Sequence, residues 1–187
     1  MSFIGQAASK MELGAPALAL LHDEMAPAEA VNALLDAGAH DDALKLLARL
    51  LPKRFVVAWV CQCARGEPLS VEARVGASLA EKWARDPVEE NRRAAFEFAS
   101  AGGYKTLGAW IAATAGWAGG SMGPADLKDV IPPPEHLTAV AACAAINMLA
   151  LLDKGNFEER RLAFIKRALG PLGQVAGAGG AAMNRHE

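Results

Sequence analysis

The chain alternates between segments in which apolar residues recur at helical spacing and short breaks rich in glycine and proline. Apolar side chains return every three or four positions, which places them along one face of an α-helix. Proline is favourable in the first turn of a helix, and glycine commonly follows its last residue. This pattern predicts eight helices, over residues 27–37, 41–51, 52–65, 69–85, 87–101, 107–119, 137–152 and 157–169.

The two ends of the chain lack such a pattern. Residues 1–26 are predicted to be loose, with one short helix around Ala17 to Leu21, and residues 170–187 to form a disordered, glycine-rich tail after a helical domain at 27–169. Alanine is abundant and β-branched residues are sparse, which favours helix over sheet. We therefore predict an all-α, single-domain bundle of about seven or eight helices, with HEAT-like stacked hairpins as one arrangement that the pattern allows.

The sharpest helix start in the sequence is the run Asp86-Pro87-Val88-Glu89. Asp86 is predicted to cap the helix, with Pro87 at its first position and Glu89 returning a hydrogen bond to the cap. Asn91 falls on the apolar side of this helix, where an unpaired amide would cost about 1–3 kcal/mol. We therefore expect Asn91 to be buried and bonded to a backbone group, with the turn at 119–124 as a candidate.

Two helices are predicted to supply most of the aromatic core. The helix over residues 52–65 has a wide apolar arc, in which Phe55, Val56 and Trp59 are the largest side chains. In the helix over residues 107–119, Trp110 and Trp117 lie on one stripe, and small residues fill the rest and let neighbouring backbones approach closely. These side chains are therefore expected to be core residues.

Charge and cysteine content narrow the classes of partner and compartment. With 19 basic and 21 acidic residues the net charge is -2, so no positive field favours nucleic acid or an anionic membrane. The apolar stretch from Leu137 to Leu152 is shorter than the roughly 20 residues that span a bilayer, so a buried helix is expected. Three cysteines argue against a disulfide framework, and the first residues make a poor signal peptide, which predicts a cytoplasmic protein.

One short motif could be mistaken for an active site. Residues 119–123 match the G-x-S-x-G pattern around Ser121, and Asp129 and His136 follow in the order of a hydrolase. That motif needs a strand before the serine, whereas here a helix precedes it and Pro124 follows. A glycine-rich turn is the preferred interpretation, and a serine hydrolase is an alternative.

The remaining residues offer no other familiar chemistry. The four histidines are far apart in sequence and lie in no zinc-binding pattern, and no glycine loop follows a strand to hold phosphate. The sequence therefore predicts no metal, no cofactor and no enzymatic activity.

A protein-binding surface is the more specific prediction. On the helical projection Phe96 lies beside Arg92 at the edge of the charged face, close to the loop that follows the next helix. Arginine and aromatic side chains are enriched where proteins bind one another. The candidate partner surface is therefore formed by Arg92, Phe96, Trp117, Ser121 and Met122.

Three blocks of the sequence resemble a known family. They lie in residues 51–65, in 83–95 with Asp86-Pro87 and Glu89–Ala95, and in 117–138 with Trp117–Met122, Pro132–Pro134 and His136–Thr138. The family is an uncharacterised one of small all-helical bacterial proteins, often encoded near type VI secretion spike and cargo genes. The resemblance implies an adaptor or chaperone-like role towards a secreted cargo or spike protein, and supplies no catalytic residues. An immunity protein that neutralises a partner toxin is the alternative.

Overall fold

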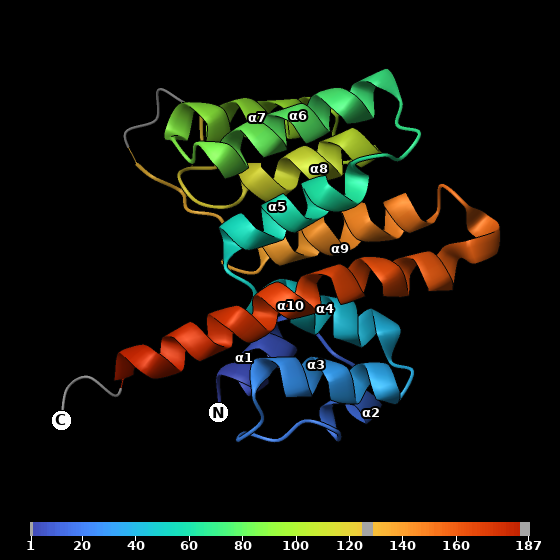
Figure 1. Cartoon of the computed structure of the whole chain (residues 1–187). Helices are drawn as coiled ribbons and strands as arrows, with labels where there is room; N and C mark the ends of the chain where they lie inside the picture. The colour runs from blue at the N-terminus through green and yellow to red at the C-terminus, as the bar shows by residue number, and fades with distance from the viewer. Residues whose placement is uncertain (1, 125–128, 184–187) are drawn as a thin grey trace. The chain divides into compact units, whose positions relative to one another are not determined.

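The structure is a computed structural model that describes residues 2–124 and 129–183 (Figure 1). Every regular element in this described part is a helix, which confirms the all-α prediction. The chain divides into two compact units, which are described separately below. Unit 1 combines Met1–Leu51 with Glu158–Glu187, and unit 2 comprises Pro52–Phe157.

Unit 1 is built around a helical hairpin and contains the last helix of the chain. Its core side chains are Leu34 of the hairpin's first helix, Leu44 and Leu47 of the second, and Ile165 of the last, all fully buried. The helices are α1 (Phe3–Lys10), α2 (Ala15–Leu18), α3 (Pro27–Asp36), α4 (His40–Leu50) and α10 (Phe157–Met183). Helix α4 contacts both α1 and α3, as its apolar stripe predicts.

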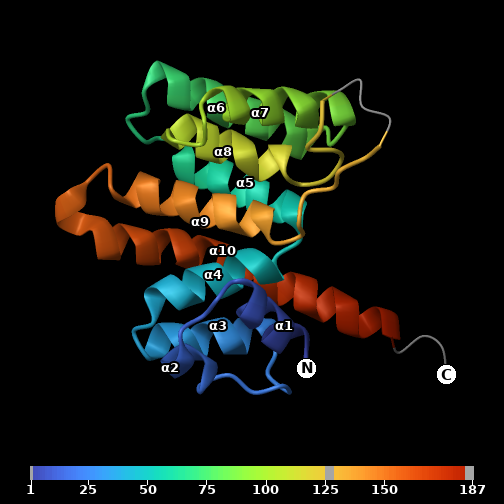
Figure 2. The ribbon, with the colours of Figure 1, turned by 180° about the vertical axis from the view of Figure 1, so that it is seen from behind.

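Unit 2 is arranged around one central helix. Its elements are α5 (Lys53–Ala64), α6 (Val71–Arg85), α7 (Glu89–Ala101), α8 (Leu107–Gly116), α9 (Leu137–Ala150) and the 3-10 turn η1 (Lys154–Asn156). Helix α8 contacts α5, α6, α7 and α9, and both views place it between the α6–α7 pair and α9 (Figures 1 and 2). Repeats of a solenoid contact only their neighbours, so unit 2 differs from a HEAT-like stack.

The close approach of α6 to α8 depends on glycine. A Cβ added to Gly76 would lie 2.7 Å from the Cα of Gly108, inside any normal contact distance. Because neither residue has a side chain, the two backbones can cross here, and the buried alanines of α8 fill the surrounding space. The small residues of α8 therefore have the packing role that their sequence suggests.

The first residues are more ordered than their sequence predicts. Residues 3–10 form α1, and the short helix α2 lies at 15–18 rather than around residues 17–21. The hydroxyl of Ser2 accepts a hydrogen bond from the Gly5 amide at 3.1 Å and donates one to Asp23 at 2.6 Å. Helix α1 buries Ile4, so a side-chain cap and tertiary burial form a helix too short for a periodic signal.

The last helix extends beyond its predicted end. We expected it to stop at residue 169 and a disordered tail to follow, but α10 continues to Met183 and contains Pro171. Leu172, beyond the predicted end, is only 1% exposed. Its burial stabilises helix in a segment whose glycines and proline are poor helix formers.

Burial of the three large apolar side chains of α5 was predicted correctly at two positions and wrongly at one. Val56 and Trp59 are buried, but Phe55 is 48% exposed. Phe55 lies in the first turn of α5, next to Arg54, whose guanidinium donates to the Ala84 carbonyl at 2.7 Å. Since Arg54 and Phe55 share the outer side of the helix, the apolar arc is narrower than the sequence indicates.

Within residues 2–124 and 129–183, no single helix is both long and apolar enough to cross a bilayer. One pair, α9 with Lys154–Gln174, reaches that length and composition only when both helices are counted together.

Candidate functional site

Asn91 is buried, as predicted, but its hydrogen-bond partner lies in the turn between α6 and α7. Asn91 is 4% exposed, and its side-chain amide donates to the Asp86 carbonyl at 2.8 Å. Val88 is the N-cap of α7, so the predicted side-chain cap by Asp86 at this position is wrong. Asn91 therefore has the backbone partner that its burial requires, but it fixes the α6–α7 turn instead of the loop at 119–124.

Arg92 holds that loop. Arg92 is 2% exposed, and its guanidinium donates to the carbonyl oxygens of Gly116 at 2.5 Å and Ser121 at 3.1 Å. It also pairs with the Glu89 carboxylate through two bonds of 2.6 Å. The last carbonyls of a helix lack intrahelical partners and favour a cation, so Arg92 stabilises the C-terminal end of α8.

The aromatic residues of this region form a cluster inside the unit. Trp117 is 8% exposed, and its ring stacks on Tyr104 with centroids 4.9 Å apart. Trp110 meets Trp117 edge-on at 6.0 Å, a favourable aromatic geometry. Trp117 is therefore a core residue.

The predicted partner surface is consequently not assembled as expected. Arg92 and Trp117, its arginine and its largest aromatic side chain, are both buried. Phe96, Ser121 and Met122 are partly exposed. The guanidinium groups of Arg92 and Arg93 lie over the Phe96 ring, with the Cζ atom of Arg92 5.8 Å from the ring centroid. Most residues of the predicted partner surface therefore stabilise the loop at 119–124 instead of facing a partner.

Ser121 organises a turn. Its hydroxyl accepts hydrogen bonds from the Gly123 amide at 3.2 Å and the Ile131 amide at 3.0 Å. Gly120 has a φ of +64°, and a Cβ there would lie 2.6 Å from a Glu89 carboxylate oxygen, so this glycine is required by conformation and by space. A helix, α8, precedes the serine where a nucleophile elbow has a strand. The motif is therefore a structural turn in this fold.

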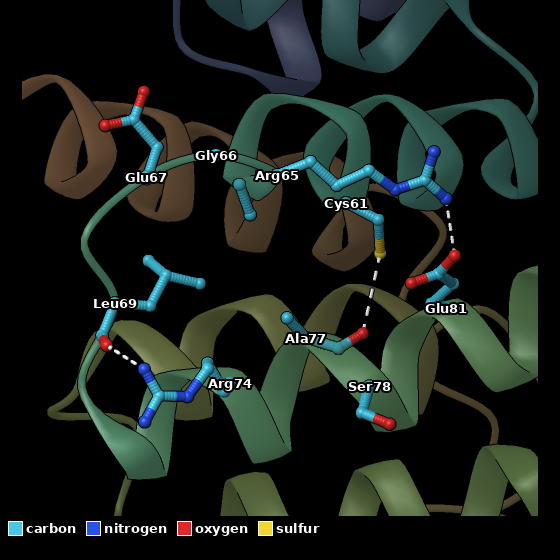
Figure 3. A pocket seen from close by; sticks show the side chains of 10 residues that line it. Cys61, Arg65, Gly66, Glu67, Leu69, Arg74, Ala77, Ser78 and Glu81 are labelled. Atoms are coloured by element: carbon cyan, nitrogen blue, oxygen red, sulfur yellow. Dashed lines mark hydrogen bonds and ion pairs between the residues drawn. The ribbon is translucent and has the colours of Figure 1, made fainter.

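A pocket that the sequence does not predict lies between α5 and α6 (Figure 3). Its volume is about 310 Å³. The connecting loop begins at Gly66, with φ +82°, and ends at Ser70, whose hydroxyl accepts from the Ala73 amide at 3.1 Å and caps α6. The lining residues are Cys61, Ala64, Arg65, Gly66, Glu67, Leu69, Arg74, Ala77, Ser78 and Glu81.

The pocket has a charged group at each end and an apolar floor. Figure 3 shows Arg65 paired with Glu81 at one end, and at the other Arg74, which donates to the Leu69 carbonyl at 2.8 Å. Between them the Cys61 thiol points towards the Ala77 carbonyl, 3.8 Å away. Burial raises the pKa of Cys61 to about 12, so its thiol stays protonated and is a poor nucleophile.

One signal in the sequence could have located this pocket. Arg74, Ala77, Ser78 and Glu81 are spaced three, one and three residues apart, so they share one face of α6. On that face, two charged residues flank two small ones. The small side chains leave space for a pocket that larger side chains would fill. The partner helix could not be identified without the fold, since nothing local pairs this face with Cys61.

Among the residues that the structure describes, no three His, Cys, Asp or Glu side chains gather closely enough to hold an ion.

A protein-family model described as a family of unknown function, DUF6931, matches residues 30–170. The chain belongs to this family. The DUF6931 match covers all of unit 2, including the Arg92 network and the α5–α6 pocket, and leaves out α1 and α2. No curated protein and no solved structure matches the chain.

Proposed function

We propose that this protein is a non-enzymatic interaction module that binds another protein through helix α6 of unit 2. The observation that carries the proposal is the exposure of Val71 and Val75, at 70% and 44%. They lie one helical turn apart, and each precedes a pocket residue, Arg74 or Ser78, by three positions. Exposed apolar side chains beside a hollow with an arginine resemble the centre of a protein interface.

The partner class comes from the sequence resemblance. The family that the three sequence blocks resemble is often encoded near type VI secretion spike and cargo genes, and this resemblance implies that the partner is a secreted cargo or spike component. An adaptor or chaperone-like protein needs an exposed surface for its client and no catalytic group. The two valines and the adjacent pocket of about 310 Å³ offer such a surface.

Co-purification tests the α6 surface. A tagged type VI secretion spike or cargo protein from the same organism is expected to capture the wild type and to lose at least about ten-fold in affinity for V71D/V75D, because charge replaces apolar contact. Val130→Asp is the matched control, since Val130 is 68% exposed in the same unit. Equal capture of wild type and double variant would remove this surface, and no capture of wild type would remove the partner class.

A further variant compares this surface with the one that the sequence predicts. Phe96→Asp places a charge on α7, and the partly exposed Phe96 is distant in sequence from both valines. We expect capture to persist in Phe96→Asp, provided that circular dichroism shows it folded. Capture lost in Phe96→Asp and retained in V71D/V75D would move the contact to α7.

A further inference from the structure

We infer that the pocket between α5 and α6 binds the C-terminal end of a polypeptide, with the carboxylate on Arg74 and a small apolar last side chain on the pocket floor. This inference rests on the proposed function, since it names the part of the partner protein that is recognised. The pocket lies entirely within unit 2.

Charge in the pocket favours a single carboxylate. The positive charge of Arg65 is neutralised by Glu81, and the carboxylate of Glu67 points away from α6 (Figure 3). Arg74 donates only to a neutral carbonyl, and among the described residues it has no carboxylate within salt-bridge distance. The lining is neutral overall, with two arginines and two glutamates, so Arg74 can receive a monoanion, whereas a phosphate dianion would also lie near the carboxylates of Glu67 and Glu81.

The orientation of Arg74 also suits a carboxylate. One terminal nitrogen, Nη1, is committed to the Leu69 carbonyl, and this bond fixes the guanidinium plane. The edge formed by Nε and Nη2 stays available, and it matches the two oxygens of a carboxylate. A preorganised arginine loses little freedom when such a group binds.

The floor of the pocket specifies the rest of the ligand. Cys61, Ala64, Leu69 and Ala77 provide apolar contact, and a volume of about 310 Å³ is at the lower end of ligand pockets. Such a site holds one side chain of moderate size. Ser78 can bond the terminal peptide group, and the residues before it can then lie over Val71 and Val75, which flank the pocket on α6.

Two small probes isolate the role of the carboxylate. N-acetyl-leucine and N-acetyl-leucinamide differ only in that group, and titration of the ¹⁵N-labelled full chain by NMR measures each. We expect the acid to bind with a dissociation constant in about the millimolar range and the amide at least about ten-fold more weakly. Equal binding of the two probes, or no binding of the acid, overturns the inference.

Two variants and one control locate the site. Arg74→Met is expected to lose the preference for the acid, and Ala77→Leu to block both probes by filling the floor. Lys82→Met is the matched control, because Lys82 is exposed on the same helix outside the pocket. Unchanged binding in folded Arg74→Met and Ala77→Leu contradicts the assignment.

A longer probe distinguishes a polypeptide end from a free carboxylic acid. Capture of the cargo or spike protein then distinguishes the pocket inference from the proposed function. An N-acetylated tetrapeptide ending in leucine should bind more tightly than N-acetyl-leucine, whereas equal affinity identifies a free carboxylic acid and overturns the polypeptide end. If Arg74→Met still captures the cargo or spike protein, the pocket inference fails and the proposed function stands. If wild type captures neither protein but prefers the tetrapeptide, the pocket chemistry stands and the partner class fails.

Discussion

The buried guanidinium of Arg92 donates to the carbonyl oxygen of Gly116 at 2.5 Å, and this bond joins α7 to the end of α8. Without the donor, the Gly116 carbonyl would be left buried and unpaired, at a cost of about 1–3 kcal/mol. We expect Arg92→Met to lower the free energy of unfolding of unit 2 by about that amount. Urea denaturation followed by tryptophan fluorescence measures it, because all four tryptophans lie in unit 2.

Arg93 supplies the control for this prediction. It donates to the Gly123 carbonyl at 2.8 Å from a half-buried position, where water can replace the lost donor. Arg93→Met should therefore cost less than about 1 kcal/mol. Arg92→Lys should resemble Arg92→Met, since an ammonium cannot reach three separate acceptors in the guanidinium geometry. Equal losses at positions 92 and 93 would contradict the capping role.

The crossing of α6 and α8 yields a second prediction. Gly76→Ala forces a methyl group against the Gly108 backbone, which cannot move without displacing α8 from its four neighbours. We expect a loss of about 1–3 kcal/mol, although alanine is the better helix former. The same tryptophan-detected unfolding gives the value.

The matched substitution is Gly173→Ala in α10, where an added Cβ would meet no atom within 4 Å. With no clash, only helix propensity acts, and alanine should leave stability unchanged or raise it by up to about 1 kcal/mol. Because unit 1 contains no tryptophan, this variant is followed by far-ultraviolet circular dichroism. A loss at Gly173 as large as at Gly76 would show that the close approach to Gly108 does not set the cost at Gly76.

The fold class and most of the helices followed from local pattern. The hairpin of α3 and α4 begins at Pro27 and turns at Gly38, whose φ of +74° suits glycine, so both boundaries were visible in sequence. Helix α1 was missed because its stability comes from burial of Ile4 and the Ser2–Asp23 bond, which no spacing encodes. The extension of α10 beyond residue 169 was missed for the same reason, since it depends on the burial of Leu172.

The site shows why side-chain roles are harder to predict than helices. An arginine on a helical projection is expected at the surface, yet Arg92 is buried, because the end of α8 and a loop 29 positions away supply its acceptors. The burial of Asn91 was predictable from its own helix, but its partner Asp86 was not. The pocket joins two helices that local pattern treats separately.

The Glu89–Arg92 pair predicts a dependence on pH. The hydrogen bonds from Arg92 lower the pKa of Glu89 below its ordinary value of 4.5. Because the folded pKa is below the unfolded one, the pair stabilises above about pH 4.5, and this contribution disappears as pH falls through the folded pKa. The stability advantage of wild type over Glu89→Gln should shrink in that acidic window. It should stay below about 1 kcal/mol, since the Glu89 side chain is 59% exposed.

A double-mutant cycle identifies the source of that dependence. In an Arg92→Met background, the effect of Glu89→Gln should change much less between pH 7 and pH 3, because only the weaker charge interaction with Arg93 remains. Urea unfolding at each pH provides the four free energies. A pH-dependent difference that survives undiminished in the Arg92→Met background would assign the effect to another group near Glu89.

Cysteine labelling provides the last prediction and tests the burial around the pocket. Cys61 is 4% exposed and Cys63 is fully buried, whereas Cys143 is partly exposed. Because burial raises the pKa of Cys61 to about 12, almost none of it is the reactive thiolate at pH 8. Iodoacetamide should therefore modify Cys143 first in the native protein, and all three at similar rates in urea, as peptide mass spectrometry can resolve. Native labelling of Cys61 as fast as Cys143 would mean that the floor of the α5–α6 pocket opens to solvent, which would also weaken the case for a preformed site.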